Sequence, residues 1–548
     1  MSLRPEPIGS VPEATARIAR AVFRRGNVYL RLRDELGTIY VDETFASLFP
    51  TRGQPAEAPW RLAVVMVLQF AEGLSDRQAA EAVRSRIDWK YLLGLALDDP
   101  GFDYSILSEF RARLIAGRAE LLLLDSLLQR VEALGLLKRR GRQRTDSTHV
   151  LAAVRTLNRL ERVGETLRAA LNAVAVVAPD WLRAQAPPKW YDRYGQRVEN
   201  YALPKTEAAR QALAASIGAD GQALLRAIDT RGQTWLQQVP AVQILRRVWI
   251  EQYITDAGEL RWREVKEMPP PAELICSPYD PEARYSTKRD LEWVGYKLHL
   301  TETCDPDTPH LLTNVETTPA TTPDDNMLAV VHASLAVRNR LPAEHLVDKG
   351  YTDAHVLVDS QREYGVTIVG PVAEDPSWQA QAHAGFAKAD FLIDWEAQTA
   401  TCPTGKPSLS WLVNPDATKP ATVVVRFSRR DCSPCPARSQ CTRRQLEPRE
   451  LVLQPRLEHE ALRTARRHQH TPAFRAQYAA RAGIESTHAQ AVRRSGLRQA
   501  RYIGLARTRL QHIATATAIN VIRLGEWWAG TPPGRTRHSH FAALQPAA

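Results

Sequence analysis

The sequence lacks any apolar stretch long enough to cross a membrane. Its strongest apolar run, LAVVMVLQF at residues 62–70, is much shorter than the roughly 20 residues that a spanning helix needs. The N-terminal segment MSLRPEPIGSVPEATARIAR contains no apolar core of the kind found in a secretory signal. We therefore expect a cytoplasmic protein with no membrane partner.

Cysteine is also scarce, and basic residues outnumber acidic ones. The chain has six cysteines in 548 residues, and because cytoplasmic proteins rarely form disulfides, no disulfide framework is expected. Lys and Arg number 72 against 61 Asp and Glu, which gives a net charge of +11. This balance favours a polyanionic partner, either nucleic acid or a membrane surface, although a protein can be basic without one. The length predicts two to four domains, or one domain with large insertions.

Residues 43–117 have the apolar spacing of helices, interrupted at Gly73. Ser75, followed by Gln78 three positions later, has the pattern of a capping box that starts a new helix. The predicted inner face of that helix consists of Ala79, Ala80, Val83 and Ile87. A helix, a glycine-containing turn and a second helix outline a helix-turn-helix, but packed helices without a DNA partner share this outline.

Further along, the pattern alternates between helices and strands. A helix is predicted over 119–137, a strand around Asp146, and an Arg-rich helical insertion over 155–270 that breaks at APPKWYDRY. From residue 291 two β-rich runs predict a hairpin, followed by a helix starting at MLAVV and by a strand, loop, helix and strand starting at EHLVDKG. This order predicts an α/β fold with a mixed sheet flanked by helices. Residues 472–528 are again helical.

Three acidic residues stand in settings that suit catalysis. Asp146 lies in a predicted strand after a basic run, and Asp348 ends another strand, where sites form in open α/β sheets. Glu485 lies in a predicted helix and shares one face with Tyr478 and Arg481. Each acid could instead be an ordinary cap, strand end or surface ion pair. Together they form hard oxygen ligands of the kind that Mg²⁺ prefers, and two such ions can assist phosphodiester cleavage.

Four motifs give the chain a resemblance to a known family. They are TDSTHV (145–150), DPEARYSTKRDLEWVGYKLHL (280–300), VDKGYTD (347–353) and YAARAGIESTHAQAVRRSGLRQARYIGLART (478–508). Together with the helical segment 43–117, they resemble bacterial insertion-sequence transposases of the DDE class. The resemblance is closest to the IS1182 group, which is related to the IS4/IS5-type transposases, and it covers nearly the whole chain.

The resemblance implies an RNase H-like catalytic core in which Asp146, Asp348 and Glu485 form the catalytic, metal-binding triad. It also implies a DNA transposase that uses two Mg²⁺ or Mn²⁺ ions to cleave the terminal inverted repeats and transfer the freed 3′-OH ends to target DNA. The partner would be double-stranded DNA, bound by a homodimer at the bacterial nucleoid. The alternatives are a sequence-specific, metal-dependent nuclease and an inactive DNA-binding regulator derived from a transposase. The intact triad argues against the regulator.

Related transposases carry Tyr, Arg, Glu and Lys around the catalytic glutamate. Tyr478, Arg481 and Glu485 match the first three positions. Val492 stands where the Lys is expected, and Arg493 follows it. This departure affects the role of the fourth position and leaves the triad intact.

Four cysteines have a spacing that suggests a metal. Cys402, Cys432, Cys435 and Cys441 form C-x29-C-x2-C-x5-C, which in a cytosolic protein favours tetrahedral Zn²⁺. Four free thiols are the alternative. A zinc ion with four cysteine ligands would be structural, because no coordination position stays open. The two other cysteines, Cys276 and Cys304, are expected to be packing residues.

No acidic residue occurs from 486 to 525. The arginines of this span are Arg493, Arg494, Arg498, Arg501, Arg507, Arg509 and Arg523. Their one-sided charge beside Glu485 predicts contacts with phosphates, which position DNA without reading its sequence. The predicted DNA-binding residues are Tyr478, Arg481, Arg493, Arg494, Arg498, Arg501 and Lys349. Pairing of these arginines with acidic residues of another domain is the alternative.

These predictions divide the chain into eight parts. They are an N-terminal arm (1–42), a helical DNA-binding domain (43–137), the first core strand (138–154), a helical insertion (155–280), the RNase H-like core (281–372), a Cys-rich zinc-binding insertion (373–470), C-terminal core helices (471–530) and a flexible tail (531–548). The three triad residues would thus come from three separate parts of the chain.

Overall fold

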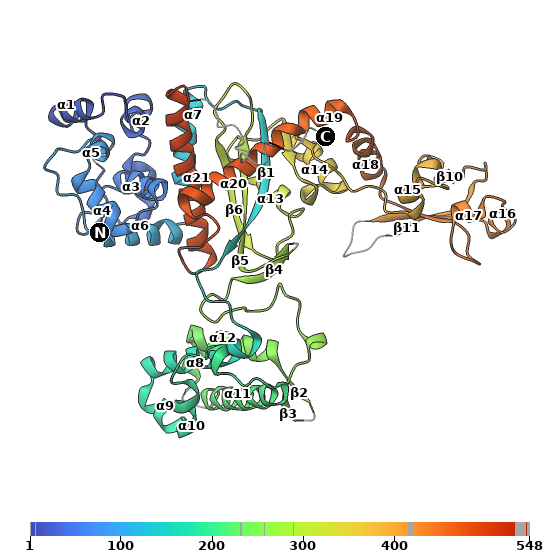
Figure 1. The fold of residues 1–548 in the computed structure, drawn as a ribbon, viewed down its shortest axis with the longest axis horizontal. Helices are drawn as coiled ribbons and strands as arrows, with labels where there is room; N and C mark the ends of the chain where they lie inside the picture. The colour runs from blue at the N-terminus through green and yellow to red at the C-terminus, as the bar shows by residue number, and fades with distance from the viewer. Residues whose placement is uncertain are drawn as a thin grey trace.

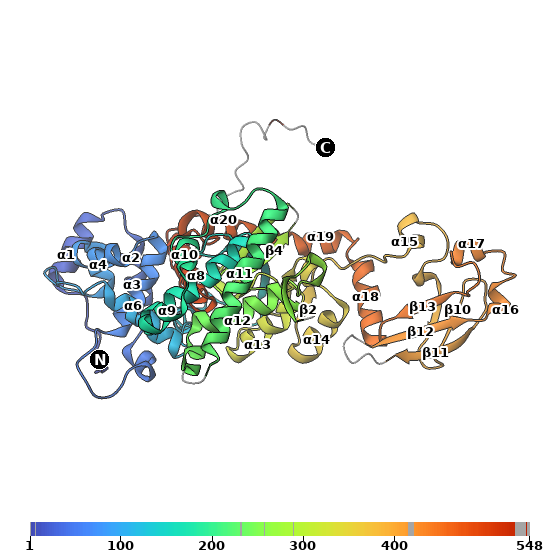
Figure 2. The ribbon, with the colours of Figure 1, turned by 90° about the horizontal axis from the view of Figure 1, so that it is seen from below.

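The computed structural model describes residues 2–5, 7–230, 233–256, 258–288, 290–414, 421–531 and 544. A mixed sheet occupies the centre, and α21 (Leu505–Trp528) runs beside it (Figure 1). The N-terminal helices lie on one side of α21, a helical insertion lies below the sheet, and a Cys-rich extension projects from the other side (Figures 1 and 2). The α/β fold class predicted from the sequence is confirmed. No helix in the described ranges is long and apolar enough to span a membrane.

The central sheet has the strand order β6–β5–β1–β7–β8, and β4 also pairs with β5. β5 runs antiparallel to β1, β4 and β6, whereas β7 runs parallel to β1 and β8. The strands are β1 (Arg142–Leu151), β4 (Arg284–Lys288), β5 (Leu291–Thr303), β6 (Leu312–Pro319), β7 (Glu344–Val347) and β8 (Thr367–Val369). The predicted hairpin is the β5–β6 pair, and the predicted helices are α13 (Met327–Val337) and α14 (Ala354–Tyr364).

The turn predicted at Gly73 is present in the N-terminal helices. α3 (Pro59–Glu72) begins at a proline and ends where Gly73 takes a left-handed conformation. The capping box of Ser75 and Gln78 is also present and starts α4 (Asp76–Ser85). On the predicted inner face Ala79, Ala80 and Val83 are buried, whereas Ile87 begins the next helix and is partly exposed.

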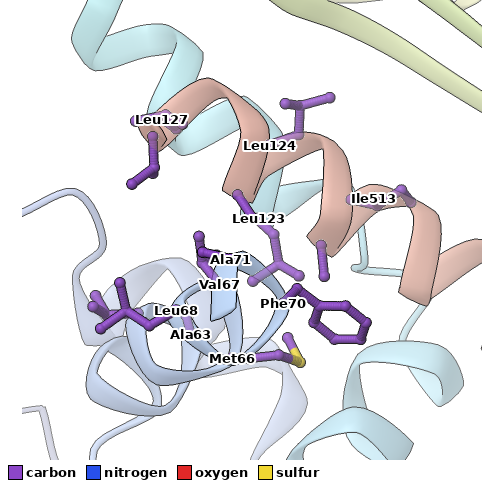
Figure 3. Packing of buried hydrophobic residues seen from close by; sticks show 14 of the residues in the cluster. Ala63, Met66, Val67, Leu68, Phe70, Ala71, Leu123, Leu124, Leu127 and Ile513 are labelled. Atoms are coloured by element: carbon purple, nitrogen blue, oxygen red, sulfur yellow. The ribbon is translucent and has the colours of Figure 1, made fainter. Parts of the chain in front are cut away.

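These N-terminal helices share one hydrophobic core with α21. Phe70, Leu123 and Ile513 belong to the same buried cluster, which Figure 3 shows from close by. The segment 1–42, expected to be an arm, contributes the buried Leu32 to this core. The remaining helices here are α1 (Glu13–Val22), α2 (Val28–Leu36), η1 (Asp42–Leu48), α5 (Ile87–Leu93), α6 (Ser105–Ala116) and α7 (Leu122–Ala133).

The helical insertion follows β1 and has a hydrophobic core of its own. Its elements are α8 (Arg159–Val177), α9 (Pro179–Gln185), α10 (Pro188–Tyr194), α11 (Glu207–Ile228), α12 (Pro240–Gln252), β2 (Tyr253–Asp256) and β3 (Glu259–Trp262). The break predicted at APPKWYDRY is present at its first two residues, Ala186 and Pro187, which separate α9 from α10, whereas the rest of the segment forms α10. Pro188 occupies the first turn of that helix, where the missing N–H has no intrahelical partner to lose.

The Cys-rich extension is built from short strands and helices, and α18 packs against α14 where the extension meets the central body (Figure 2). The strands are β9 (Leu392–Asp394), β10 (Thr399–Thr401), β11 (Ser408–Asn414), β12 (Thr422–Phe427) and β13 (Glu450–Leu453). The helices are α15 (Trp378–Ala382), α16 (Arg429–Cys432), α17 (Arg438–Cys441) and α18 (Arg456–His468). Strands β11, β12 and β13 form an antiparallel sheet over a small apolar core.

The C-terminal segment is helical, as predicted, but it is not one continuous α-helix through Tyr478, Arg481 and Glu485. It divides into α19 (Pro472–Tyr478), a 3-10 turn η7 (Ala479–Ala482), α20 (Gly483–Ser495) and then α21. Gly496, in a left-handed conformation, ends α20. The predicted tail 531–548 lies outside the described residues, apart from residues 531 and 544.

Candidate active site

The parallel pairing of β1 and β7 brings Asp146 and Asp348 together. In this register Thr145 lies beside Val347, so the next residue in each segment is an aspartate. Asp146 Oδ1 accepts a hydrogen bond from the Ser147 N–H at 2.8 Å, and Asp348 caps the 3-10 turn that follows it. Asp348 therefore stands at the C-terminal end of the parallel strands, the edge where ligand sites form in α/β sheets.

One arginine contacts all three carboxylates of the predicted triad. Arg481 Nη2 lies 2.8 Å from Asp146 Oδ2 and 3.8 Å from Asp348 Oδ2. Its Nη1 lies 3.0 Å from Glu485 Oε1. The Arg481 side chain is 14% exposed, whereas that of Glu485 is 68% exposed. Three acids that are far apart in the sequence thus converge on a single positive charge, and the glutamate is the most exposed of them.

Burial shapes the charge state of this site. Burial raises the pKa of Asp146, and the Arg481 guanidinium opposes the rise. Burial also raises the pKa of Asp348, and the neighbouring Asp146 carboxylate adds to the increase. Because two close carboxylates disfavour each other's ionised form, a nearby cation lowers the energy of the pair.

The donor set suits a hard divalent cation. Carboxylate oxygens are the ligands that Mg²⁺ prefers, and these three groups already surround a positive charge. Across the described residues, no three Asp, Glu, His or Cys side chains are arranged to hold a metal ion as they stand. Arg481 occupies the space between the carboxylates, so metal binding requires its guanidinium to move.

A buried ion network holds the helix of Glu485 against the sheet. Glu302, on β5, is fully buried and binds Arg144 and Arg523, each at 2.7 Å. Thr487, on α20, donates its hydroxyl to Glu302 Oε2 at 2.7 Å. The expected phosphate contact by Arg523 is therefore wrong, because this arginine pairs with a carboxylate inside the protein. No local sequence pattern indicates the role of Glu302, because its partners lie far away along the chain.

Besides Arg481, three of the predicted DNA-binding residues lie near the carboxylates. Tyr478 stacks on Phe474 with ring centroids 5.4 Å apart, and burial raises its pKa. Arg498 Nε donates to Thr148 Oγ1 at 3.0 Å. Because side chains alternate along a strand, Thr148 lies on the same face of β1 as Asp146. Lys349 directly follows Asp348 and is exposed.

The other predicted DNA-binding arginines lie at the end of α20 and beyond it. Arg493 is exposed, and Arg494 Nη2 lies 3.8 Å from Glu526 Oε1. Arg501 lies over the ring of Phe70, 5.0 Å from its centroid, and donates to the Leu74 carbonyl at 3.4 Å. Arg501 therefore contacts the N-terminal helices, whereas Arg493 has no carboxylate partner among the described residues.

The four spaced cysteines line one cavity. Cys402, Cys432, Cys435 and Cys441 surround a space of about 30 Å³, and all six cysteines of the chain are free thiols. In the part of the chain that the structure describes, the four sulfurs do not form a metal-holding group as they stand. The two remaining cysteines, Cys276 and Cys304, are buried, as expected of packing residues.

The structure adds a fourth carboxylate that the sequence did not indicate. Asp324 lies in the loop between β6 and α13. Burial is the main cause of the raised pKa of Asp146 and Asp348, and the negative charge of Asp324 adds to it in both cases. In the sequence it belongs to the run TTPATTPDDN, whose Pro and Asp content is typical of a turn. Its proximity to the triad comes from tertiary structure alone.

Two segments of the chain match models of known protein families. Residues 401–525 match the family described as "Transposase DDE domain", and residues 19–113 match the family described as "Transposase domain". Both matches are to transposase domains, and together they cover less than half of the chain. The pair indicates an insertion-element DDE transposase of the IS1182 type, which confirms the resemblance found in the sequence motifs. No curated protein and no solved structure matches the chain.

The two matches cover different parts of the structure. The DDE match includes the four spaced cysteines, Glu485 and most of α21, but neither Asp146 nor Asp348. The second match includes α2 through most of α6 and crosses the boundary expected at residue 42.

Proposed function

We propose that this chain cleaves phosphodiester bonds at the ends of an insertion element and transfers the freed 3′-OH ends to target DNA. The observation that carries the proposal is the convergence of Asp146, Asp348 and Glu485 on one guanidinium, in a chain with two transposase domains. The sheet supports it as well. Strands β6, β5 and β1 are antiparallel and β1, β7 and β8 are parallel, an order that suits an RNase H-like core.

Asp146, Asp348 and Glu485 hold Mg²⁺ or Mn²⁺ in this proposal. Ions bound there supply a water of lowered pKa and stabilise negative charge on the phosphate oxygens. The Ser147 N–H orients the Asp146 carboxylate, and the Glu302 network fixes the helix that carries Glu485. Arg481, once displaced from the carboxylates, is free to bind a DNA phosphate.

The proposed partner is double-stranded DNA, bound by two copies of the chain. Arg498 lies beside the triad strand, in the turn after α20, and the exposed Arg493 lies in the last turn of α20. Side chains in this arrangement bind phosphates along the DNA backbone and set its register relative to the carboxylates.

The test is a cleavage and joining assay on a duplex taken from the DNA that flanks the reading frame. With Mg²⁺, a transposase yields a free 3′-OH end and a product joined to target DNA. Cleavage without joining would indicate the nuclease, and binding alone would indicate the regulator. Asp348→Asn is expected to lower cleavage by roughly 100-fold or more while DNA binding persists. Asp359→Asn, which changes a partly exposed acid of α14 paired with Arg362, is the matched control.

We also propose that Cys402, Cys432, Cys435 and Cys441 bind one structural Zn²⁺. Four thiols around one cavity, two of them in a C-x2-C pair, support this assignment. Elemental analysis of the purified chain is expected to give one zinc per molecule. Cys435→Ser should lose it, whereas Cys304→Ser, which changes a buried cysteine outside the cavity, should keep it. A wild-type content well below one zinc per chain would contradict the assignment.

A further inference from the structure

Asp324 is held in a fixed position by two partners. Its Oδ1 lies 3.0 Å from Lys297 Nζ, and its Oδ2 accepts a hydrogen bond from Ser147 Oγ at 3.0 Å. Lys297 also donates to the Thr322 carbonyl at 2.6 Å, which ties strand β5 to the same loop. The side chains of Asp324 and Lys297 are only 16% and 15% exposed, so solvent screens this ion pair little.

Ser147 connects Asp324 to the triad. The Ser147 hydroxyl binds Asp324, while its main-chain N–H donates to Asp146 Oδ1 at 2.8 Å. Asp348 is close to the same loop: a Cβ added at Gly350 would lie 3.2 Å from Asp348 Oδ1 and 3.5 Å from Asp324 Oδ2. Asp324 is thus linked to the Asp146 carboxylate through Ser147, and both Asp324 and Asp348 lie close to Gly350.

We propose that Asp324 is a positioning residue of the metal site, which orients the Asp146 carboxylate through Ser147. This inference rests on the proposed function. Lys297 neutralises Asp324, so the loop supplies a hydrogen-bond acceptor to Ser147 without adding an unpaired charge beside the triad. With that acceptor in place, the Ser147 N–H keeps its direction toward Asp146 Oδ1 when Arg481 leaves.

The expected loss of metal affinity on replacing Asp324 follows from its hydrogen bond to Ser147, which in turn binds the Asp146 carboxylate. Groups that hydrogen-bond to metal ligands, or hold such groups in place, typically change metal affinity by about 10- to 100-fold when removed. A loop tether without this role would instead lower stability and leave metal affinity unchanged. The adjacent Asp325 provides a matched control, since its carboxylate accepts a hydrogen bond from the Asn326 N–H.

The experiment is a Mn²⁺ titration of the full chain, followed by the electron paramagnetic resonance signal of free Mn²⁺, together with the melting temperature of the metal-free protein. Asp324→Ala and Ser147→Ala are expected to weaken Mn²⁺ binding by about 10-fold or more, and Asp325→Ala to leave it unchanged. Ser147→Ala removes a single hydroxyl. Its Mn²⁺ affinity therefore tests the positioning role even if Asp324→Ala fails to fold.

Unchanged Mn²⁺ affinity in Ser147→Ala, or an equal loss in Asp325→Ala, would overturn the positioning role. The comparison of wild type with Asp348→Asn tests the proposed function itself. If wild type and Asp348→Asn bind Mn²⁺ equally, the triad is not the metal site, whatever Asp324 does.

Discussion

Arg481 Nη2 lies 2.8 Å from Asp146 Oδ2. This arginine is predicted from the sequence to bind DNA, but in the metal-free structure it neutralises the Asp146 carboxylate. The same guanidinium reaches Asp348 and Glu485. The metal-free site is therefore stabilised by an internal cation, and a divalent ion has to compete with it. This competition gives Arg481 two separable effects, one on metal binding and one on DNA cleavage.

Replacing Arg481 should separate those effects. Arg481→Gln removes the competing charge, so Mg²⁺ is expected to bind more tightly and to raise the melting temperature more than in wild type. Cleavage is expected to fall more than DNA affinity, because a phosphate contact at the reacting end is lost. Thermal shifts with Mg²⁺ and the cleavage assay measure the two effects. Arg475→Gln, an exposed arginine on α19, is the control, and weaker Mg²⁺ binding in Arg481→Gln would contradict this account.

The raised pKa of Asp348 predicts a dependence of stability on pH. Burial, with Asp146 nearby, raises this pKa in the folded state, so the carboxyl group stabilises the metal-free fold below its unfolded pKa. That contribution is lost as the pH rises through the raised value. Asp348→Asn should therefore melt at a higher temperature than wild type at pH 8 without metal, and the difference should vanish in acid. A lower melting temperature of Asp348→Asn at pH 8 would refute the prediction.

The buried Glu302 network should matter for folding. Glu302→Gln leaves Arg144 and Arg523 without their carboxylate, and breaking such a buried pair costs about 3 kcal/mol or more. Chemical denaturation should show this loss in the unfolding free energy. Glu292→Gln changes an exposed acid on the same strand and should cost little. Equal stability of the two variants would show that the network contributes nothing.

The arginines after Glu485 are expected to fall into two groups. Arg493 is exposed without a carboxylate partner, so Arg493→Ala should reduce the salt slope of DNA binding by about 1 and leave the melting temperature unchanged. Arg501 packs on Phe70, so Arg501→Ala should lower the melting temperature and leave the slope unchanged. Affinity measured against salt concentration, beside thermal melting, tests both. An unchanged slope with lowered stability in Arg493→Ala would place that residue among the internal contacts.

The triad residues stood out in the sequence because each has a local setting that recurs in catalytic sites. Asp146 follows a basic run, Asp348 precedes a glycine at a strand end, and Glu485 follows a spaced Tyr and Arg. Their convergence depends on the pairing of β1 with β7 and on the Arg481 contacts, which local patterns indicate only indirectly. A family resemblance supplied that part of the prediction.

The missed features depend on contacts between distant segments. Asp324 belongs to a run typical of a turn, and its bond to Ser147 forms only when the β6–α13 loop folds over β1. Arg523 on α21 pairs with Glu302 on β5, which is far away in the sequence, so the positive charge at this position of the C-terminal span does not mark a DNA surface. The break predicted at APPKWYDRY is local and is present at Ala186 and Pro187, and Pro188 then begins the next helix.

The most direct test is the location of metal ions in the chain bound to an element-end duplex. Crystals grown with Mn²⁺ and measured at a wavelength that gives anomalous scattering show where each ion binds. The account predicts anomalous peaks within coordination distance of Asp146, Asp348 and Glu485, with Arg481 displaced from all three carboxylates. The opposite result is the absence of any peak there, with Arg481 still bridging the carboxylates, in a preparation that cleaves the same DNA.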